Sequence, residues 1–398
     1  MHQVDVNDES ILSKDTFHKL RANSPVSGWF PALQDLSWCI TRSNLPHADL
    51  FFSPHLKTIS ISMPWAWRNS NIPHDVLPAI ASIISALPVS ALQVLTVDVD
   101  RRMRPSQYFK DSLSSVVLRC GPSLVEFTST IPLSEAAVDH LIRLPHLSIW
   151  HIEGPPPSYT ASSLPLAFPP LTGLTLGEGA EHGWLSLLKR LEDGGSTVQG
   201  VTPLSKVKKS LKRLIIEYLP VPIIDISFTS PIQIFQNLVD LNVDACCGDE
   251  HNGKCTFKLN NNDVTVFAMA LPRLEYFLLE PGCFQNTCAT TVACLLPISV
   301  HCLKLQQLEI HFNTTNIVDD LRTISEDPKF QELRSLPRCS LNHLDAWRTP
   351  LTLDEPDFEI VANGMIDIFP SLEGCAGWGE FEGTWHGLSN RIAELREL

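Results

Sequence analysis

Cysteine and histidine are the residues of this sequence best suited to chemistry, and they are densest in residues 245–255, ACCGDEHNGKC. Three thiols and one imidazole lie close enough there to surround a zinc ion: Cys246, Cys247, Cys255 and His251. Their spacing matches no common zinc motif, and Cys246 directly follows an apolar segment, where a buried thiol is ordinary. The segment is either a metal site or a loop whose cysteines pack. We favour the loop and expect no metal and no other cofactor.

Motifs of the common enzyme classes are absent from the sequence. It contains no GxSxG elbow, no GxxxxGK[ST] phosphate loop, no HExxH and no dinucleotide-binding GxGxxG. His301 and Cys302 are adjacent, but adjacency in sequence does not make a nucleophile and its base. We therefore expect that the protein is not an enzyme. A metal-dependent or Cys/His enzyme is the remote alternative.

The charge of the chain argues against binding to nucleic acid. Its 398 residues include 44 acidic and 30 basic side chains, which gives a formal net charge of -14. A surface of that sign repels a phosphate backbone. The amino terminus, MHQVDVNDES, is polar and acidic, and no apolar stretch approaches the roughly 18 residues of a membrane span. We expect a protein of the cytoplasm or nucleus that binds neither nucleic acid nor a membrane.

Two further features concern the cellular compartment. The eleven cysteines are odd in number and form no CxxC pair, so reduced thiols are expected. A basic run is open to two interpretations, a nuclear-import signal or a solvated entry to the next strand, and we favour the second. The run consists of Lys206, Lys208, Lys209, Lys212 and Arg213.

One short apolar phrase recurs about twelve times along the chain. It consists of an apolar residue, two variable residues, a second apolar residue, one variable residue and usually a third apolar residue. The phrases begin at Leu33, Leu56, Leu92, Leu124, Leu147, Leu171, Leu211, Leu238, Leu274, Leu305, Leu341 and Leu372. This is the rhythm of leucine-rich repeats of uneven length.

Each phrase suits a short strand, because its second and third apolar residues lie on one face and the first anchors the turn before it. A single strand of this kind cannot bury its apolar face, so such strands stack side by side. The sequence therefore predicts an α/β leucine-rich-repeat solenoid of about twelve irregular strand-helix repeats. We expect a curved parallel sheet with helices on its convex side.

Segments with helical spacing separate the strand phrases and are expected to form the convex layer. They are DVLPAIASIISAL, YFKDSLSSVVLRC, SEAAVDHLIRL, HGWLSLLKRLEDGG, NDVTVFAMAL and EPDFEIVANGMIDIF. Proline often precedes the next anchor leucine, where it ends the helix and extends the chain. We assign residues 1–29 to an N-terminal lead-in or cap, 30–380 to the solenoid and 381–398 to a C-terminal capping helix.

The phrases themselves resemble those of a known family. FPALQDLSW, LFFSPHLKTISISM, VSALQVLTVDV, LPHLSIWHIEG, FPPLTGLTL and FPSLEGCAGW look like the carboxy-terminal repeat region of fungal F-box proteins, especially those of mushroom-forming fungi. The resemblance extends from about Phe30 to Trp378. In that family an F-box docks on the adaptor of a cullin ubiquitin ligase, and the repeats capture the protein to be ubiquitinated. The resemblance therefore implies a substrate-recognition region.

The sequence departs from this family at its amino-terminal end. The residues before the first phrase are too few for the three-helix F-box and lack its usual Leu-Pro opening. IPHDVLPAIASII starts in a similar way, but it lies between the second and third repeats, and we interpret it as a repeat helix. The chain is then either a truncated product or a relative that has lost the docking part. We expect the ligase adaptor as a partner only if an F-box lies upstream, and otherwise a stand-alone repeat scaffold.

The repeat register also predicts which side chains a protein partner meets. Residues on either side of the second apolar position alternate away from the core and are expected on the concave face. These positions include Glu126, Ile149, His151, Arg213, Asp240, Asn242, Tyr276, Leu278, Gln307, Glu309, His343 and Asp345.

Acidic residues follow the third apolar position in five phrases, and stacking is expected to line them up as a negative ridge. They are Asp98, Glu153, Glu217, Asp244 and Glu280. We predict that the ridge and a second group of residues bind a basic, aromatic-seeking protein segment. The second group is Tyr276, Glu309, His311, His343 and Trp347. In the alternative interpretation, the acidic residues only end strands in solvent and the tryptophans pack within the last repeats.

Overall fold

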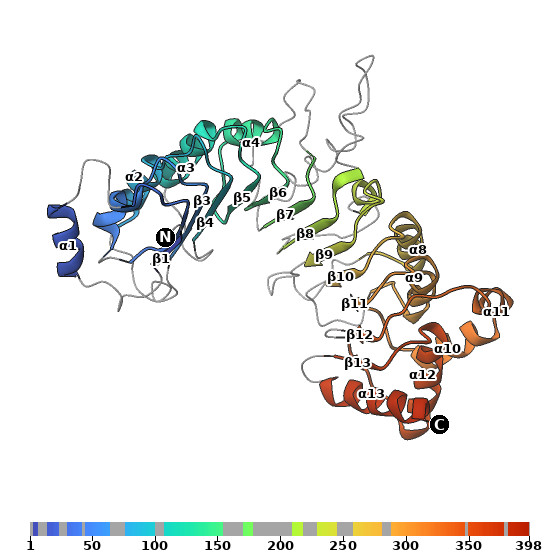
Figure 1. Cartoon of the computed structure of the whole chain (residues 1–398). Coiled ribbons are helices and arrows are strands. Elements are labelled where there is room, and N and C mark those ends of the chain that lie inside the picture. The colour runs from blue at the N-terminus through green and yellow to red at the C-terminus, as the bar shows by residue number, and fades with distance from the viewer. Residues whose placement is uncertain are drawn as a thin grey trace, which may run out of the picture. The chain divides into compact units, whose positions relative to one another are not determined.

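The computed structural model of the protein describes residues 3–6, 14–23, 30–41, 44–63, 76–99, 107–153, 170–177, 209–217, 229–244, 258–280, 288–346, 349–377 and 381–397. The chain divides into two compact units, Met1–Ser186 with Gly194–Val207 and Leu187–Asp193 with Lys208–Leu398. Each unit contains a series of parallel strands with helices against one face (Figure 1).

Strands of the first unit follow one another in sequence order, and each is parallel to the next. They are β1 (Gln3–Val6), β2 (Asp35–Cys39), β3 (Thr58–Ser62), β4 (Val94–Asp98), β5 (Glu126–Ser129), β6 (Ile149–Ile152) and β7 (Gly173–Leu176). Equivalent residues of successive phrases are register partners, as Leu36, Ile59 and Leu95 illustrate. The repeat phrase thus sets the alignment of the strands.

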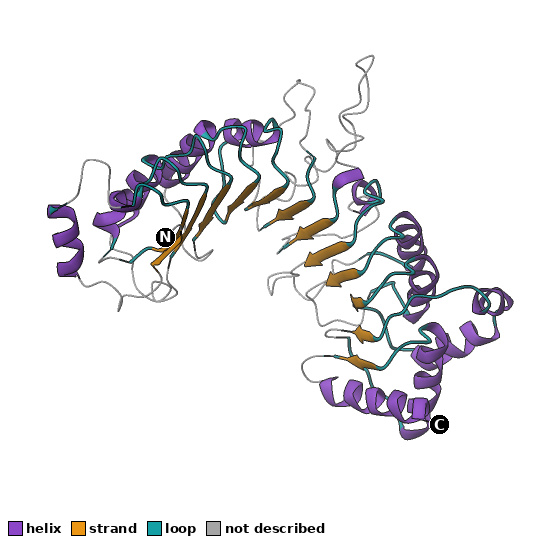
Figure 2. Cartoon of the chain, viewed as in Figure 1, coloured by secondary structure: helices purple, strands orange, loops and turns teal. Residues whose placement is uncertain are grey.

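Helices of the first unit connect its strands and lie on one side of them (Figure 2). They are α1 (Lys14–Ala22), the 3-10 helix η1 (Leu45–Phe51), α2 (Val76–Ser85), α3 (Gln107–Arg119) and α4 (Glu135–Ile142). Ser134 caps the start of α4, because its hydroxyl accepts a hydrogen bond from the Ala137 amide at 3.3 Å.

The second unit repeats this arrangement with parallel strands in sequence order. They are β8 (Arg213–Ile216), β9 (Asp240–Asp244), β10 (Tyr276–Glu280), β11 (Gln307–Ile310), β12 (His343–Asp345) and β13 (Gly374–Ala376). Its helices are η3 (Ser230–Ile232), α8 (Asn261–Ala270), η5 (Val292–Cys294), α9 (Leu295–His301), α10 (Ile317–Glu326), α11 (Pro328–Arg334), α12 (Glu355–Ile368) and α13 (Glu382–Glu397).

The core of each unit lies between its strands and its helices. Apolar residues of the repeat phrases are almost completely buried, including Leu238, Leu241 and Val243 around β9. In β10, Phe277 stacks on Phe267 of α8 with ring centroids 5.6 Å apart. The apolar face of the strands therefore points at the helices, and the prediction of an α/β leucine-rich-repeat solenoid is confirmed.

The structure adds elements that the sequence analysis did not predict. Residues Gln3–Val6 form β1 beside β2, although they lie in the predicted lead-in and lack an anchor leucine. Helices α9, α10 and α11 were also not predicted. The predicted helix HGWLSLLKRLEDGG and the cysteine-rich segment ACCGDEHNGKC lie outside the described residues.

The predicted C-terminal helix is present as α13. It packs on β13 and α12, and it buries Trp385, Leu388 and Ile392. No helix among the described residues is both long and apolar enough to cross a membrane.

Candidate functional site

The second unit presents a strand face that its helices do not cover. We call it the open face and define it by two rows of register partners on β8 to β12. The first row is Arg213, Asp240, Tyr276, Gln307 and His343, and the second is Ile215, Asn242, Leu278, Glu309 and Asp345. Every one of these side chains is partly or fully exposed, in contrast to the buried residues that alternate with them.

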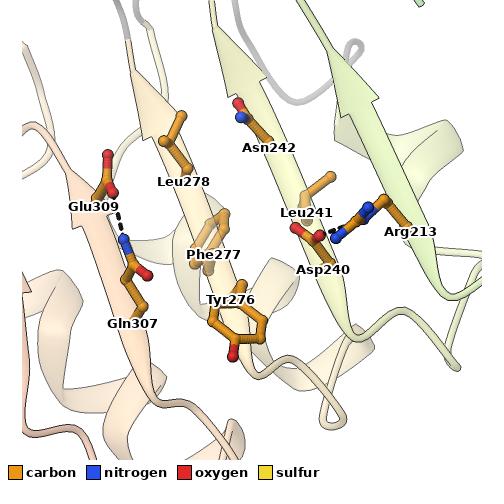
Figure 3. A pocket seen from close by; sticks show the side chains of 9 residues that line it. All are labelled: Arg213, Asp240, Leu241, Asn242, Tyr276, Phe277, Leu278, Gln307 and Glu309. Carbon is orange, nitrogen blue, oxygen red and sulfur yellow. Dashed lines mark hydrogen bonds and ion pairs between the residues drawn. The ribbon is translucent and has the colours of Figure 1, made fainter. Parts of the chain in front are cut away.

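A depression of about 210 Å³ lies on the open face, over β8 to β11 (Figure 3). Its lining residues are Arg213, Asp240, Leu241, Asn242, Tyr276, Phe277, Leu278, Gln307 and Glu309. Charged and amide side chains stand around an apolar centre that includes Leu278 and Tyr276. The strands place these groups side by side because the register is in phase from one repeat to the next.

An ion pair closes the β8 side of this depression. Arg213 Nε lies 2.6 Å from Asp240 Oδ2 on the neighbouring strand, in hydrogen-bonding geometry. The Arg213 side chain is 62% exposed, whereas that of Asp240 is 20% exposed. The charge of Asp240 is thus compensated from within the chain.

Glu309 lies on the opposite side of the depression and is half-buried. The Gln307 side-chain amide donates a hydrogen bond to Glu309 Oε1 at 2.6 Å. Burial raises the pKa of the Glu309 carboxyl above its ordinary value, and the charge of Asp345 raises it further. The hydrogen bond from Gln307 and the charge of His343 act in the opposite direction. Burial is the largest of these effects.

Tyr276 is the large apolar side chain that the open face exposes most. It is 43% exposed, although its strand neighbour Phe277 is buried beneath the helices. Exposed aromatic residues that are surrounded by polar groups are frequent anchors of protein interfaces.

The equivalent strand face of the first unit is chemically different. Its central row consists of Ser37, Ser60, Thr96, Thr128, His151 and Thr175, which are register partners across β2 to β7. These side chains are half-exposed, and all except His151 carry hydroxyl groups, whereas the equivalent row of the second unit includes Glu309 and Asp345. Carboxylates in the central row are therefore a feature of the second unit.

Members of the predicted acidic ridge lie in both units. Asp98 is exposed at the end of β4, beside Ser62 of β3. Asp244 and Glu280 are register partners on β9 and β10, and Glu217 follows β8. Of these, Glu217 and Asp244 are half-exposed, and the side chain of Glu280 lies outside the described residues.

Two of the predicted surface residues are buried, so the prediction of exposure was wrong for Glu153 of the ridge and for His311 of the second group. Glu153 is 4% exposed, and a side chain at Gly177 would collide with its carboxylate. His311 is completely buried, with its Nδ1 3.2 Å from the Thr349 hydroxyl. The prediction failed because it treated the residue after the third apolar position as the end of a strand in solvent. At these two positions that residue is itself buried.

Other predicted members keep the expected exposure. His343 is exposed at the start of β12, and Glu309 and Tyr276 belong to the depression. Trp347 lies outside the described residues. Sequence reasoning placed Asp240, Leu278 and Gln307 on the outward face but did not select them as site residues, because no motif marks them. Their positions in the repeat phrase, which are equivalent to those of Tyr276 and Glu309, were the signal that could have identified them.

Of the described cysteines, Cys39 is partly exposed and the other six are buried. The six are Cys120, Cys288, Cys294, Cys302, Cys339 and Cys375. Burial raises the pKa of Cys120, Cys302 and Cys375 to about 12 and that of Cys339 to about 11. A thiol with a pKa in this range is hardly ionised at neutral pH. Within the described ranges no group of three or more His, Cys, Asp or Glu side chains is arranged to hold a metal ion.

Comparisons with known proteins find only distant structural similarity. No family model and no curated protein matches the sequence. One similar structure is that of Rad7 in complex with Elc1 in yeast, at 14% identity and a TM-score of 0.43, covering 96% of this chain and 77% of that one. Another is the leucine-rich-repeat protein LegL7 from Legionella pneumophila, at 10% identity and a TM-score of 0.40, covering 91% and 98%.

Proposed function

We propose that this chain is a protein-recognition module and that the open face of the second unit binds its partner. The observation that carries the proposal is the exposure of Tyr276 beside the depression on this face. Burying a tyrosine ring removes a large apolar area from water and leaves its hydroxyl available for a hydrogen bond. Covering an exposed side chain of this kind makes the free energy of binding more favourable.

The extent of the open face favours a macromolecular partner. Its two rows cross five strands, β8 to β12, which at the spacing of about 4.8 Å between strands is roughly 20 Å of surface. Each of the five strands contributes at least one polar side chain to the rows. An extended protein segment matches these dimensions better than a small molecule, which would occupy only the central depression.

The predicted partner contacts that remain accessible belong to this proposal. On the open face they are Tyr276, Glu309 and His343, and in the same unit Glu217 and Asp244 are half-exposed at the ends of β8 and β9. Asp98 is exposed in the first unit and stays a separate prediction. Glu280 and Trp347 stay in the predicted set, since the structure does not describe their side chains.

The experiment that tests this function compares two exposed tyrosines. Tyr276 lies on the open face and Tyr108, which is 57% exposed, lies on α3 of the first unit. We expect Tyr276→Ala to lose proteins that the wild-type chain captures from cells, measured by quantitative mass spectrometry. Tyr108→Ala should retain them. Equal capture by both variants would exclude Tyr276 and the open face as the binding site.

A role as the substrate-recognition part of a cullin ubiquitin ligase is the finer form of this proposal. It is supported by the resemblance of the repeat phrases to fungal F-box proteins. The alternative is a stand-alone repeat scaffold without a link to a ligase. The transcript upstream of Met1 distinguishes the two: an in-frame F-box supports the ligase role, and a stop codon before Met1 supports the scaffold.

A further inference from the structure

Carboxylates on the open face differ in how their charge is compensated. Asp240 is paired with Arg213 at 2.6 Å, so its charge is satisfied within the chain. Glu309, two strands away, receives a hydrogen bond from the neutral amide of Gln307. No cationic group of the described residues forms an ion pair with Glu309. The direct hydrogen-bond donor to this half-buried carboxylate is therefore neutral, and within the described part of the chain the only compensating charge is the more distant one of His343.

The neighbour of Glu309 on the next strand makes the charged form of Glu309 less favourable. Asp345 is the register partner of Glu309, so the two acidic side chains stand directly opposite each other on β11 and β12. Like charges in this position destabilise a sheet. A positive group brought to Glu309 from outside would relieve the repulsion and replace the water that burial has removed.

Apolar surface lies next to Glu309 in the same depression. Leu278 is its register partner on β10, and Tyr276 is the diagonal neighbour. Diagonal neighbours on adjacent strands are separated by about 7–8 Å, which is within reach of one long side chain. Figure 3 shows Leu278 at about the level of Glu309 on the neighbouring strand, and Tyr276 at about the level of Gln307. A side chain with an aliphatic stem and a cationic head can contact the apolar residues with its stem and the Glu309 carboxylate with its head.

We propose that the depression receives an arginine side chain from an extended segment of the partner protein. Its methylene groups lie along Tyr276 and Leu278, and its guanidinium forms an ion pair with Glu309. This inference rests on the proposed function and adds the chemistry of the partner. Arginine fits better than lysine because its planar guanidinium stacks on an aromatic ring and pairs with a carboxylate through two parallel donors.

The Arg213 and Asp240 pair defines the orientation of the bound arginine. Arg213 lines the β8 side of the depression, where it already occupies Asp240 and leaves that carboxylate unavailable to a second guanidinium. Glu309 and Asp345 stand on the opposite side. The arginine head is therefore directed toward β11, and the segment that carries it crosses the strands of the open face.

The test uses a random heptapeptide library displayed on phage and selected on the full chain. We expect enrichment of arginine in peptides bound by the wild type, and loss of that enrichment with Glu309→Gln. The matched control is Glu326→Gln, at an exposed position at the end of α10, which should select the same arginine peptides as the wild type. Thermal unfolding of each variant verifies that it is folded.

A selected peptide then gives a quantitative measurement. Replacing its arginine with alanine should weaken binding to the wild type by about tenfold or more, because an ion-paired hydrogen bond is lost. The same replacement should have little effect on binding to Glu309→Gln. A full loss on both proteins would show that the arginine does not contact Glu309 and would overturn the inference.

Two other outcomes of the peptide selection also test the arginine site. Peptides selected without a basic residue, or no selected peptide at all, overturn the arginine site. In that case the proposed function stands if Tyr276→Ala still loses captured proteins that Tyr108→Ala retains. It fails as well if the two tyrosine variants capture the same proteins as the wild type.

Discussion

Glu309 and Asp345 are direct register partners on the adjacent parallel strands β11 and β12, so two carboxylates face each other on the open face of the second unit. Both side chains are half-exposed, and neither belongs to the buried row that packs under the helices. A pair of like charges at this position lowers the stability of the sheet. We interpret it as a feature retained for binding, because it opposes the folding of the strands that carry it.

The first prediction concerns the stability of Glu309→Gln. The pKa of Glu309 is raised in the folded state, mainly by burial, so the folded chain binds this proton more tightly than the unfolded chain does. The free energy of unfolding therefore falls as pH rises through the range above the ordinary glutamate value. At neutral pH the variant should unfold at a higher temperature than the wild type, and this gain should vanish near pH 4. Differential scanning calorimetry across this pH range measures it.

Glu326→Gln is the control for that measurement, since Glu326 is exposed on α10 away from the strands. Its melting temperature should equal that of the wild type at each pH. A Glu309→Gln protein that melts below the wild type at neutral pH would show that the carboxylate stabilises the sheet, contrary to this account.

The second prediction compares two glycines near the carboxyl terminus. A methyl group on Gly377 would collide with the indole of Trp385, which is completely buried and donates a hydrogen bond to the Thr349 carbonyl at 2.9 Å. Gly377→Ala should lower the free energy of unfolding by about 1–3 kcal/mol, since the indole has no room to move. Gly383, on α13, has no atom within 4 Å of an added methyl group. Gly383→Ala should leave stability unchanged or raise it by a few tenths of a kcal/mol. Urea unfolding of both proteins checks this, and an equal loss in both would contradict the packing of Trp385.

The third prediction concerns the start of α8. The Asn260 side chain accepts hydrogen bonds from the amides of Asn262 and Asp263 at 2.9 and 3.1 Å, and Asp263 accepts one from the Asn260 amide in return. Asn260→Ala should cost about 1 kcal/mol in chemical unfolding, because two amides lose their partner. Asn262 lies two residues later in the first turn and is exposed, so Asn262→Ala should leave the free energy of unfolding unchanged. Similar losses in the two proteins would mean that the capping box does not form.

The fourth prediction concerns thiol reactivity. Cys39 is partly exposed, whereas the other described cysteines are buried. Burial raises the pKa of Cys120 and Cys302 to about 12, so both thiols are protonated as well as inaccessible at pH 8. Among the described cysteines, iodoacetamide should modify Cys39 first and the buried ones only after denaturant is added. Peptide mass spectrometry over a time course measures the order, and early modification of Cys302 in the native protein would contradict its placement.

The strands were predictable because the repeat phrase encodes them directly. An apolar residue at every second position, anchored by a leucine, describes a strand whose partner is the next copy of the same phrase. Leu305, Leu308 and Ile310 illustrate this, since all three are completely buried around β11. The strand β1 was not predictable, because Gln3–Val6 has no anchor leucine and is ordered by pairing with β2.

The candidate site was predictable only in part. Alternation along each strand placed Tyr276 and Glu309 outward, and the structure agrees. The burial of His311 could not be read from the phrase, because it depends on Thr349, a residue of the following repeat. The pairing of Arg213 with Asp240 depends likewise on the register of two strands and on side-chain conformation. Single phrases contain none of this information.

Hydroxyl-radical footprinting of the chain with and without its captured partner tests the central claim most directly. The side chains to compare are Tyr276 and Leu278 on the open face, and Tyr108 on α3 and Met269 on α8, both exposed away from it. The account predicts that the partner protects Tyr276 and Leu278 from oxidation and leaves Tyr108 and Met269 as reactive as before. Protection of Tyr108 or Met269 with no change at Tyr276 would place the binding surface elsewhere and contradict the account.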